Sequence, residues 1–106
     1  MIHSHVFLSW QFNLPTDTGV FTTRQVLQGN EPVREVYHER DGDWQFLCGT
    51  TFNTEDLKLV CLGCMVEVDP TIGELADMPP GWCGTRQARG EAWIQKPYDE
   101  GENETS

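Results

Sequence analysis

An Asp-Gly pair between two apolar segments constrains the fold of this chain most strongly. Asp41-Gly42 separates residues 33–39 from residues 43–48. Asp-Gly readily supplies the positive φ angles that tight hairpin turns need. The second segment has the period of a strand with one packed face, because Trp44, Phe46 and Cys48 alternate with Asp43, Gln45 and Leu47. We therefore predict two antiparallel strands joined by a tight turn.

Two further segments favour strands. Residues 20–27 are rich in β-branched and apolar side chains and end before Gly29-Asn30. Because sequential strands with short connections usually pair, we expect 20–27, 33–39 and 43–48 to form a meander. Residues 58–68 fit the period of a strand and of a helix equally well. We favour a strand over 58–62 followed by a helical turn over 63–68.

The next segment carries start and stop signals of a helix. Asp69-Pro70 combines a capping side chain with a proline at the first helical position, and Pro79-Pro80-Gly81 ends the pattern. We predict a helix near 70–77 and a further short strand over 82–86. Trp10 and Phe12, in an irregular lead segment, are expected to cover one end of the core. The sum is a small α+β domain, an antiparallel sheet with one or two short helices on one face.

Length and charge limit the classes of function. The chain has 106 residues and a formal charge of −10, which fits one domain with an acidic surface. Residues 97–106 contain four acidic and no basic side chains, and we predict a disordered tail there after a domain spanning 1–96. An acidic surface repels phosphate backbones and attracts basic partners, so we expect no nucleic-acid binding. With no apolar stretch of about 18 residues, we expect no membrane span.

Four cysteines allow three interpretations. No basic region precedes the short apolar run 6–10, so we expect no export, a cytoplasmic location and reduced thiols. Cys61 and Cys64 form a CxxC pair, which could bind zinc together with Cys48 and Cys83 or act as a redox pair. Thiols that pack as small apolar side chains are the interpretation we favour. We accordingly expect no metal and no cofactor.

Catalysis finds little support among the remaining residues. His38 lies beside Glu39, Asp41 and Asp43, which could raise its pKa and suit it to general-base chemistry. The serines lie near the termini, and a hairpin end is normally solvated. We expect a protein that is not an enzyme and has no catalytic residues.

Aromatic and arginine side chains are enriched at the centres of protein interfaces. Trp82 follows a Pro-Gly turn and has Arg86 nearby. We predict a partner-binding surface that contains Trp82, Arg86, His38 and Asp41. A second copy of the chain pairing along an exposed sheet edge is an alternative partner.

The pattern as a whole resembles a known group of proteins over about residues 10–94. The resemblance lies in VFTTRQVL at 20–27, in HERDGDWQFL at 38–47, and in Asp69-Pro70 followed by Leu75, Pro80-Gly81-Trp82 and Arg86. It is to small bacterial proteins of unassigned function that are related to a family of immunity proteins, which is found near polymorphic toxins. The resemblance implies a small α+β domain that acts by binding another protein, and it supplies no catalytic residues.

Overall fold

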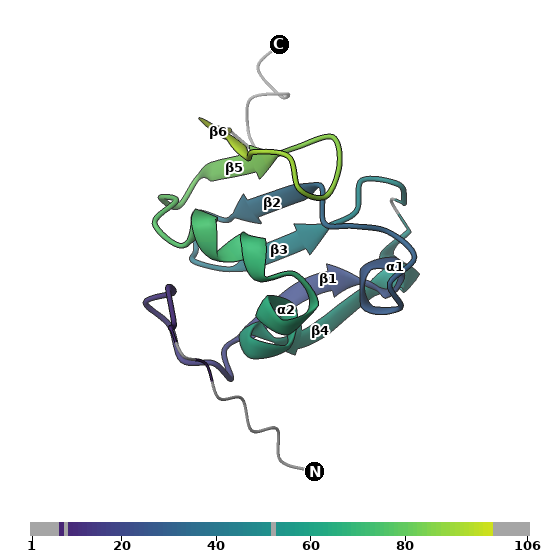
Figure 1. Cartoon of the computed structure of the whole chain (residues 1–106), viewed down its shortest axis with the longest axis horizontal. Helices are drawn as coiled ribbons and strands as arrows, with labels where there is room; N and C mark the ends of the chain where they lie inside the picture. Colours follow the sequence, from purple (N-terminus) through teal and green to yellow (C-terminus); the bar gives the residue numbers. More distant parts are fainter. Residues whose placement is uncertain (1–6, 8, 52, 99–106) are drawn as a thin grey trace.

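Six strands form one sheet in the order β4-β1-β3-β2-β5-β6. The structure, a computed structural model, describes residue 7 and residues 9–51 and 53–98. The strands are β1 (Gly19–Thr23), β2 (Glu35–His38), β3 (Trp44–Leu47), β4 (Leu57–Cys61), β5 (Trp82–Thr85) and β6 (Ile94–Pro97). The helical elements are α1 (Arg24–Leu27), η1 (Thr54–Asp56), α2 (Leu62–Val68) and η2 (Pro70–Leu75). Short helices on a mostly antiparallel sheet confirm the predicted α+β class (Figure 1).

The meander predicted over the first three strands is wrong. β1 pairs in parallel with β3, with Phe21 opposite Gln45, and β2 lies on the outer side of β3. The predicted strand 20–27 ends at Thr23, because the Thr23 hydroxyl accepts a hydrogen bond from the Val26 amide and caps α1. The chain leaves the sheet at this turn, and the following hairpin returns with β3 rather than β2 beside β1.

The predicted hairpin is confirmed. The Glu39 amide donates to the Asp43 carbonyl at 2.7 Å, and Gly42 has a φ of 101°, a value that glycine adopts without strain. His38 lies opposite Trp44 across the two strands. The alternation read from the sequence is also correct, since Trp44 and Phe46 are buried on the same face of β3.

The ambiguous segment resolves into a strand followed by a helix, as predicted. β4 ends at Cys61, whose sulfur accepts a hydrogen bond from the Cys64 amide at the start of α2. Asp69 caps the next element by accepting from the Thr71 amide. The helix predicted over 70–77 is a 3₁₀-helix that ends at Leu75, in keeping with the short pieces in which this helix occurs.

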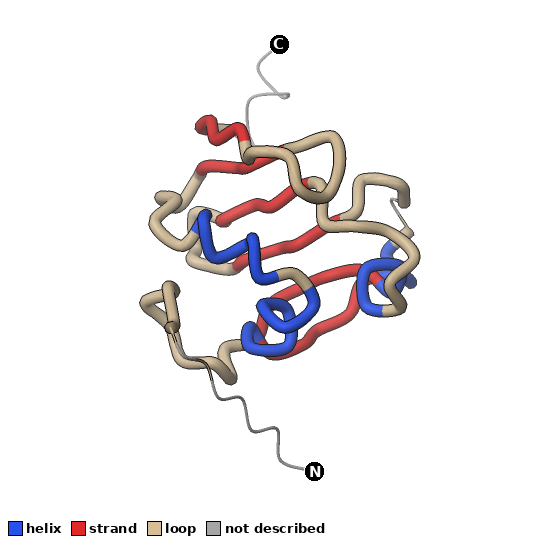
Figure 2. The backbone as a smooth tube through the Cα atoms, in the orientation of Figure 1, coloured by secondary structure: helices blue, strands red, loops and turns tan. Residues whose placement is uncertain are grey.

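The helices cover one face of the sheet and enclose the core (Figures 1 and 2). Trp10 and Phe12 pack at its edge, as expected, with the rings of Phe12 and Trp44 in edge contact at 5.4 Å. The core side chains come from the strands, the helices and the lead segment: Phe12, Val20, Val26, Val33, Val36, Trp44, Phe46, Cys48, Leu62, Met65, Val66, Ile72, Leu75 and Met78.

The ordered sheet continues past the predicted domain boundary at residue 96. Pro97 is the last residue of β6, and the Tyr98 amide donates to the Gly81 carbonyl. Residues 99–106 of the predicted tail lie outside the described residues. In the described part of the chain the longest α-helix, α2, has seven residues, far short of the roughly 20 that cross a bilayer.

Candidate functional site

Three of the four predicted partner-binding residues lie at the same end of the sheet. His38 and Trp82 are directly opposite each other on β2 and β5, and Asp41 lies at the tip of the hairpin that begins beside them. Trp82 is half-buried and packs against the core, while Asp41 is exposed. The Asp41 carboxylate accepts a hydrogen bond from the Asp43 amide, which stabilises the turn.

His38 has a packing role in this arrangement. Its ring stacks on the Trp44 ring at a centroid distance of 4.0 Å. Because a carbonyl oxygen only accepts, Nδ1 carries a hydrogen and donates it to the Met78 carbonyl at 2.7 Å. These two contacts fix the orientation of the ring and connect the segment before Pro79 to the sheet.

Arg86 cannot serve as a partner contact, which corrects that part of the predicted surface. Its side chain has no exposed area and pairs with the equally buried carboxylate of Asp69. It also donates to the Val33 carbonyl and the Thr71 hydroxyl, and its guanidinium lies over the Trp93 ring. The side chain joins β5 to η2. The sequence alone does not indicate that Arg86 is buried. Arginine is seldom buried unless it is paired, and its partner can lie far along the chain.

The sheet face opposite the helices carries a group of apolar side chains that the sequence reading missed. Phe21 and Leu59 lie directly opposite each other on β1 and β4. Leu57 shares this face two residues before Leu59, and Leu47 shares it because it alternates with the core residue Phe46. We call Phe21, Leu47, Leu57 and Leu59 the open-face cluster. Leu59 has 67% of its area exposed, the largest value among the large apolar side chains that the structure describes.

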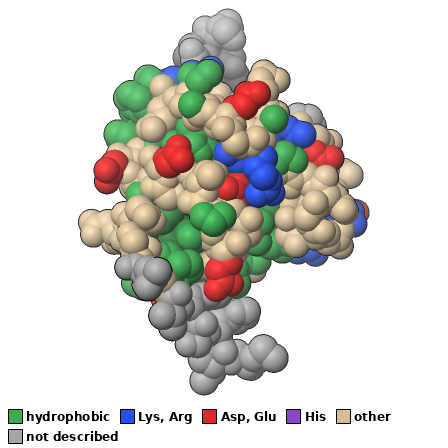
Figure 3. Space-filling view, viewed as in Figure 1, with side chains coloured by type: hydrophobic (Ala, Val, Ile, Leu, Met, Phe, Trp, Pro, Cys, Tyr) green, Lys and Arg blue, Asp and Glu red, His purple; other side chains and the backbone are tan. Residues whose placement is uncertain are grey.

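Carboxylates border the open-face cluster. Glu39 accepts a hydrogen bond from the Gln45 side chain, which lies beside Phe21 on the same face. Glu35 occupies the same face of β2 and accepts from the Tyr37 hydroxyl. Burial, followed by the charge of Glu35, raises the pKa of Tyr37 to about 12. The opposite, helix-covered face mixes apolar, acidic and basic side chains (Figure 3).

The two edge strands of the sheet differ in how they are protected. β6 carries Lys96 and Pro97, and such residues hinder the pairing of an edge with another strand. β4 has five residues, of which Lys58 is the only charged one, and it contains no proline. β4 is therefore the edge on which a further strand can pair more easily.

A hydrogen-bonded network positions the start of β4. Asp56, directly before the strand, accepts from the Arg24 guanidinium at 2.9 Å and from the Thr51 hydroxyl at 2.7 Å. Hydrogen bonds from Thr51, Arg24 and Gln25 lower the pKa of Asp56 to about 2. This carboxylate holds Leu57, and with it one end of the open-face cluster, in position.

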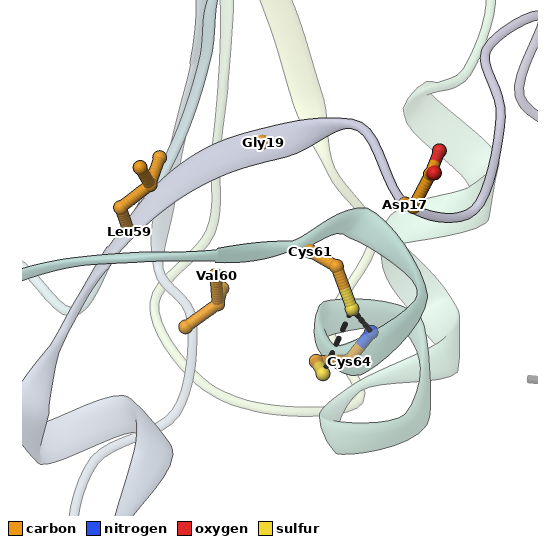
Figure 4. Close-up of a pocket in the computed structure, with 6 residues that line it drawn as sticks. All are labelled: Asp17, Gly19, Leu59, Val60, Cys61 and Cys64. Carbon is orange, nitrogen blue, oxygen red and sulfur yellow. Dashed lines mark hydrogen bonds between the residues drawn. The ribbon is translucent and has the colours of Figure 1, made fainter. Parts of the chain in front are cut away.

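The predicted CxxC pair forms a close sulfur pair at the other end of β4. Cys61 is the last residue of the strand and Cys64 lies in α2, with 2.9 Å between their Sγ atoms (Figure 4). The pair lines a shallow hollow of about 360 Å³ together with Asp17, Gly19, Leu59 and Val60. No disulfide joins the two sulfurs.

Cys48 and Cys83 lie elsewhere in the sheet. Cys48 follows β3 and Cys83 belongs to β5, and both are buried. Within the described residues, no group of three or more His, Cys, Asp or Glu side chains is placed to hold a metal ion. The convergence of all four cysteines that a zinc site would need is not found there.

Comparison of the chain with protein-family models, with curated proteins and with solved structures finds no match.

Proposed function

We propose that this chain is a non-catalytic protein-binding domain that docks a basic protein surface against the open-face cluster and the β4 edge. The observation that carries the proposal is the exposure of Leu59 beside Phe21, on the sheet face opposite the described helices. Burying large apolar side chains is the main source of binding free energy at protein interfaces.

The geometry of β4 supports a partner that contributes a strand. An edge strand presents a row of backbone donors and acceptors, and an added strand binds through them. Specificity then comes from alternate side chains, which on β4 are Leu57, Leu59 and Cys61. The apolar cluster and the free edge adjoin each other, so one extended partner segment can use both.

Charge supports a basic partner. Asp17, Glu35 and Glu39 border the cluster on its two sides. Arg24 and Arg34 are engaged by the chain's own carboxylates, in ion pairs with Asp56 and Glu31. The chain keeps a formal charge of −10, which accelerates the encounter with a positively charged protein.

The more specific form of the proposal is an immunity-type protein that acts in the cytoplasm and neutralises a toxic protein. The sequence resemblance over about residues 10–94 favours it. The packed position of His38, whose Nδ1 is engaged by the Met78 carbonyl, agrees with a role that does not require catalysis.

Capture experiments with matched variants test the proposal. Leu59→Asp places a charge in the cluster, and Ile94→Asp places the same charge at an equally exposed site (65% of its area exposed) on the opposite edge strand. Wild type and Ile94→Asp should retain the same bound protein from the native host, and Leu59→Asp should lose it. Binding of that purified protein should weaken as salt is added, because the charges are exposed.

Three results would contradict the proposal. One is equal retention by Leu59→Asp and wild type, and the second is equal loss with both aspartate variants. The third is that the wild-type protein forms homodimers at low micromolar concentration and binds no other protein. In that case the β4 edge serves a second copy of the chain.

A further inference from the structure

Cys61 and Cys64 lie side by side on the surface, where β4 passes into α2. We propose that they form a reversible dithiol–disulfide pair that exchanges with disulfides bearing neutral or positively charged groups. The inference rests on the geometry of the two sulfurs and their surroundings. It does not depend on the protein-binding proposal.

The sulfurs are already close to bonding distance. Their separation of 2.9 Å is about 0.9 Å longer than the roughly 2.05 Å of a disulfide bond. The Cys64 amide also donates to the Cys61 sulfur at 3.3 Å, which orients Cys61 toward the helix (Figure 4). A small rotation of either side chain therefore suffices to form the bond.

Access distinguishes this pair from the other cysteines. Cys61 and Cys64 are half-buried and line the hollow beside Leu59, so a small disulfide can reach them. Cys48 is completely buried and Cys83 has 3% of its area exposed. Reaction with a reagent in solution should thus begin at the pair.

The two sulfurs have different roles. Burial, followed by the hydrogen bond and the charge of Cys61, raises the pKa of Cys64 to about 11. Cys64 therefore keeps its proton at neutral pH, and Cys61, which accepts from the Cys64 amide, is the attacking sulfur.

The exchange has two steps. The Cys61 thiolate attacks one sulfur of RSSR, the S–S bond breaks, and RS⁻ leaves to take a proton as RSH. Cys64 then loses its proton and attacks Cys61 Sγ, which breaks the mixed disulfide and releases a second RS⁻. The chain loses two electrons and two protons, and one disulfide becomes two thiols.

Carboxylates around the hollow select the disulfide. Asp17 lines the hollow, and Glu67 acts on Cys64 through its charge. These charges repel an anionic disulfide such as oxidised glutathione and attract a cationic one such as cystamine. Neutral hydroxyethyl disulfide should react at an intermediate rate.

Mass spectrometry of the reduced full chain tests the inference. After cystamine treatment and alkylation under denaturing conditions, wild type should have lost two hydrogens, carry two alkyl groups and show a Cys61–Cys64 link by peptide mapping. The rate should exceed that with oxidised glutathione by about tenfold at low salt. Added salt should reduce this ratio.

Variants separate the two roles. Cys64→Ser should retain one cysteamine adduct on Cys61, whereas Cys61→Ser should form little adduct. Peptide mapping of wild type needs no variant, so a misfolded variant leaves the test intact. A link or adduct on Cys48 or Cys83, four alkylated thiols after treatment, or equal rates with the three disulfides would overturn the inference.

Discussion

Asp69 and Arg86, 17 residues apart in the sequence, form an ion pair whose two side chains are buried. The pair joins the cap of η2 to the end of β5, where Arg86 also contacts the Trp93 ring. Both charges are satisfied inside the protein, since Asp69 also accepts from the Thr71 amide and hydroxyl. This pair therefore links the helical layer to the sheet.

Removing one charge of the pair should destabilise the fold. Asp69→Asn leaves a buried guanidinium without its counter-charge, and we expect a loss of about 3 kcal/mol in the free energy of unfolding. Urea unfolding followed by tryptophan fluorescence measures it. Arg89→Gln is the control, because Arg89 lies 4.0 Å from the same carboxylate but is half exposed, and it should change stability by less than about 0.5 kcal/mol. Equal effects of the two substitutions would contradict a buried pair.

Much of the local structure could be predicted because short-range signals determine it. Asp41-Gly42 sets the turn, and Asp69-Pro70 caps the next helical element. The strand-to-helix change after Cys61 was also found. These features depend on residues within a few positions of one another.

Features that depend on distant residues were not predicted. The parallel pairing of β1 with β3 joins Phe21 to Gln45, and no local pattern indicates it. The same is true of Arg86, whose burial depends on Asp69 and Trp93. For the open-face cluster a signal existed, because Leu57 and Leu59 alternate with Lys58 and Val60. This signal was missed because the alternate residues, which continue from Val60 into α2, appeared to form the packed face of the strand.

A methyl group added at Gly84 should disturb the core. A Cβ there would lie 3.1 Å from both methyl carbons of Leu75, which is completely buried. We expect Gly84→Ala to cost about 1 to 3 kcal/mol in urea unfolding. Gly73→Ala should cost far less, because its Cβ would meet the flexible end of the exposed Gln11 side chain. A destabilisation by Gly73→Ala as large as that by Gly84→Ala would be inconsistent with this packing.

Acid should weaken the anchor of β4. Hydrogen bonds from Thr51 and Arg24 lower the pKa of Asp56 to about 2, whereas an unfolded aspartate titrates near about 4. A lowered pKa gives stability that is fully present above the unfolded value and is lost as the pH falls from about 4 toward 2. Urea midpoints measured across this range should decline less in Asp56→Asn than in wild type. In Arg24→Gln the decline should be smaller and should end at a higher pH, because the pKa of Asp56 then lies closer to that of an unfolded aspartate. Identical profiles for all three proteins would contradict the network.

Tyr37 should titrate late at alkaline pH. Burial, followed by the charge of Glu35, raises the pKa of Tyr37 to about 12, against about 10 in an unfolded chain. The stability that its neutral form contributes is present below about pH 10 and is lost as the pH rises toward 12. Tyrosinate absorbance of the native protein should show a step near pH 12 that is missing in Tyr37→Phe. A step that persists in this variant belongs to Tyr98, the other tyrosine, and would refute the assignment.

The most direct test of the docking surface uses a synthetic extended peptide of alternating Leu and Lys residues, followed by amide NMR of the labelled protein. We predict that the peptide changes the amide chemical shifts of β4 and β1 around Leu59 and Phe21. These changes should be lost in Leu59→Asp and should persist in Ile94→Asp. A matched peptide with Glu in place of Lys should bind far more weakly. Shifts centred on β6 or on the helices, or equal binding of the two peptides, would contradict a basic partner at the open-face cluster.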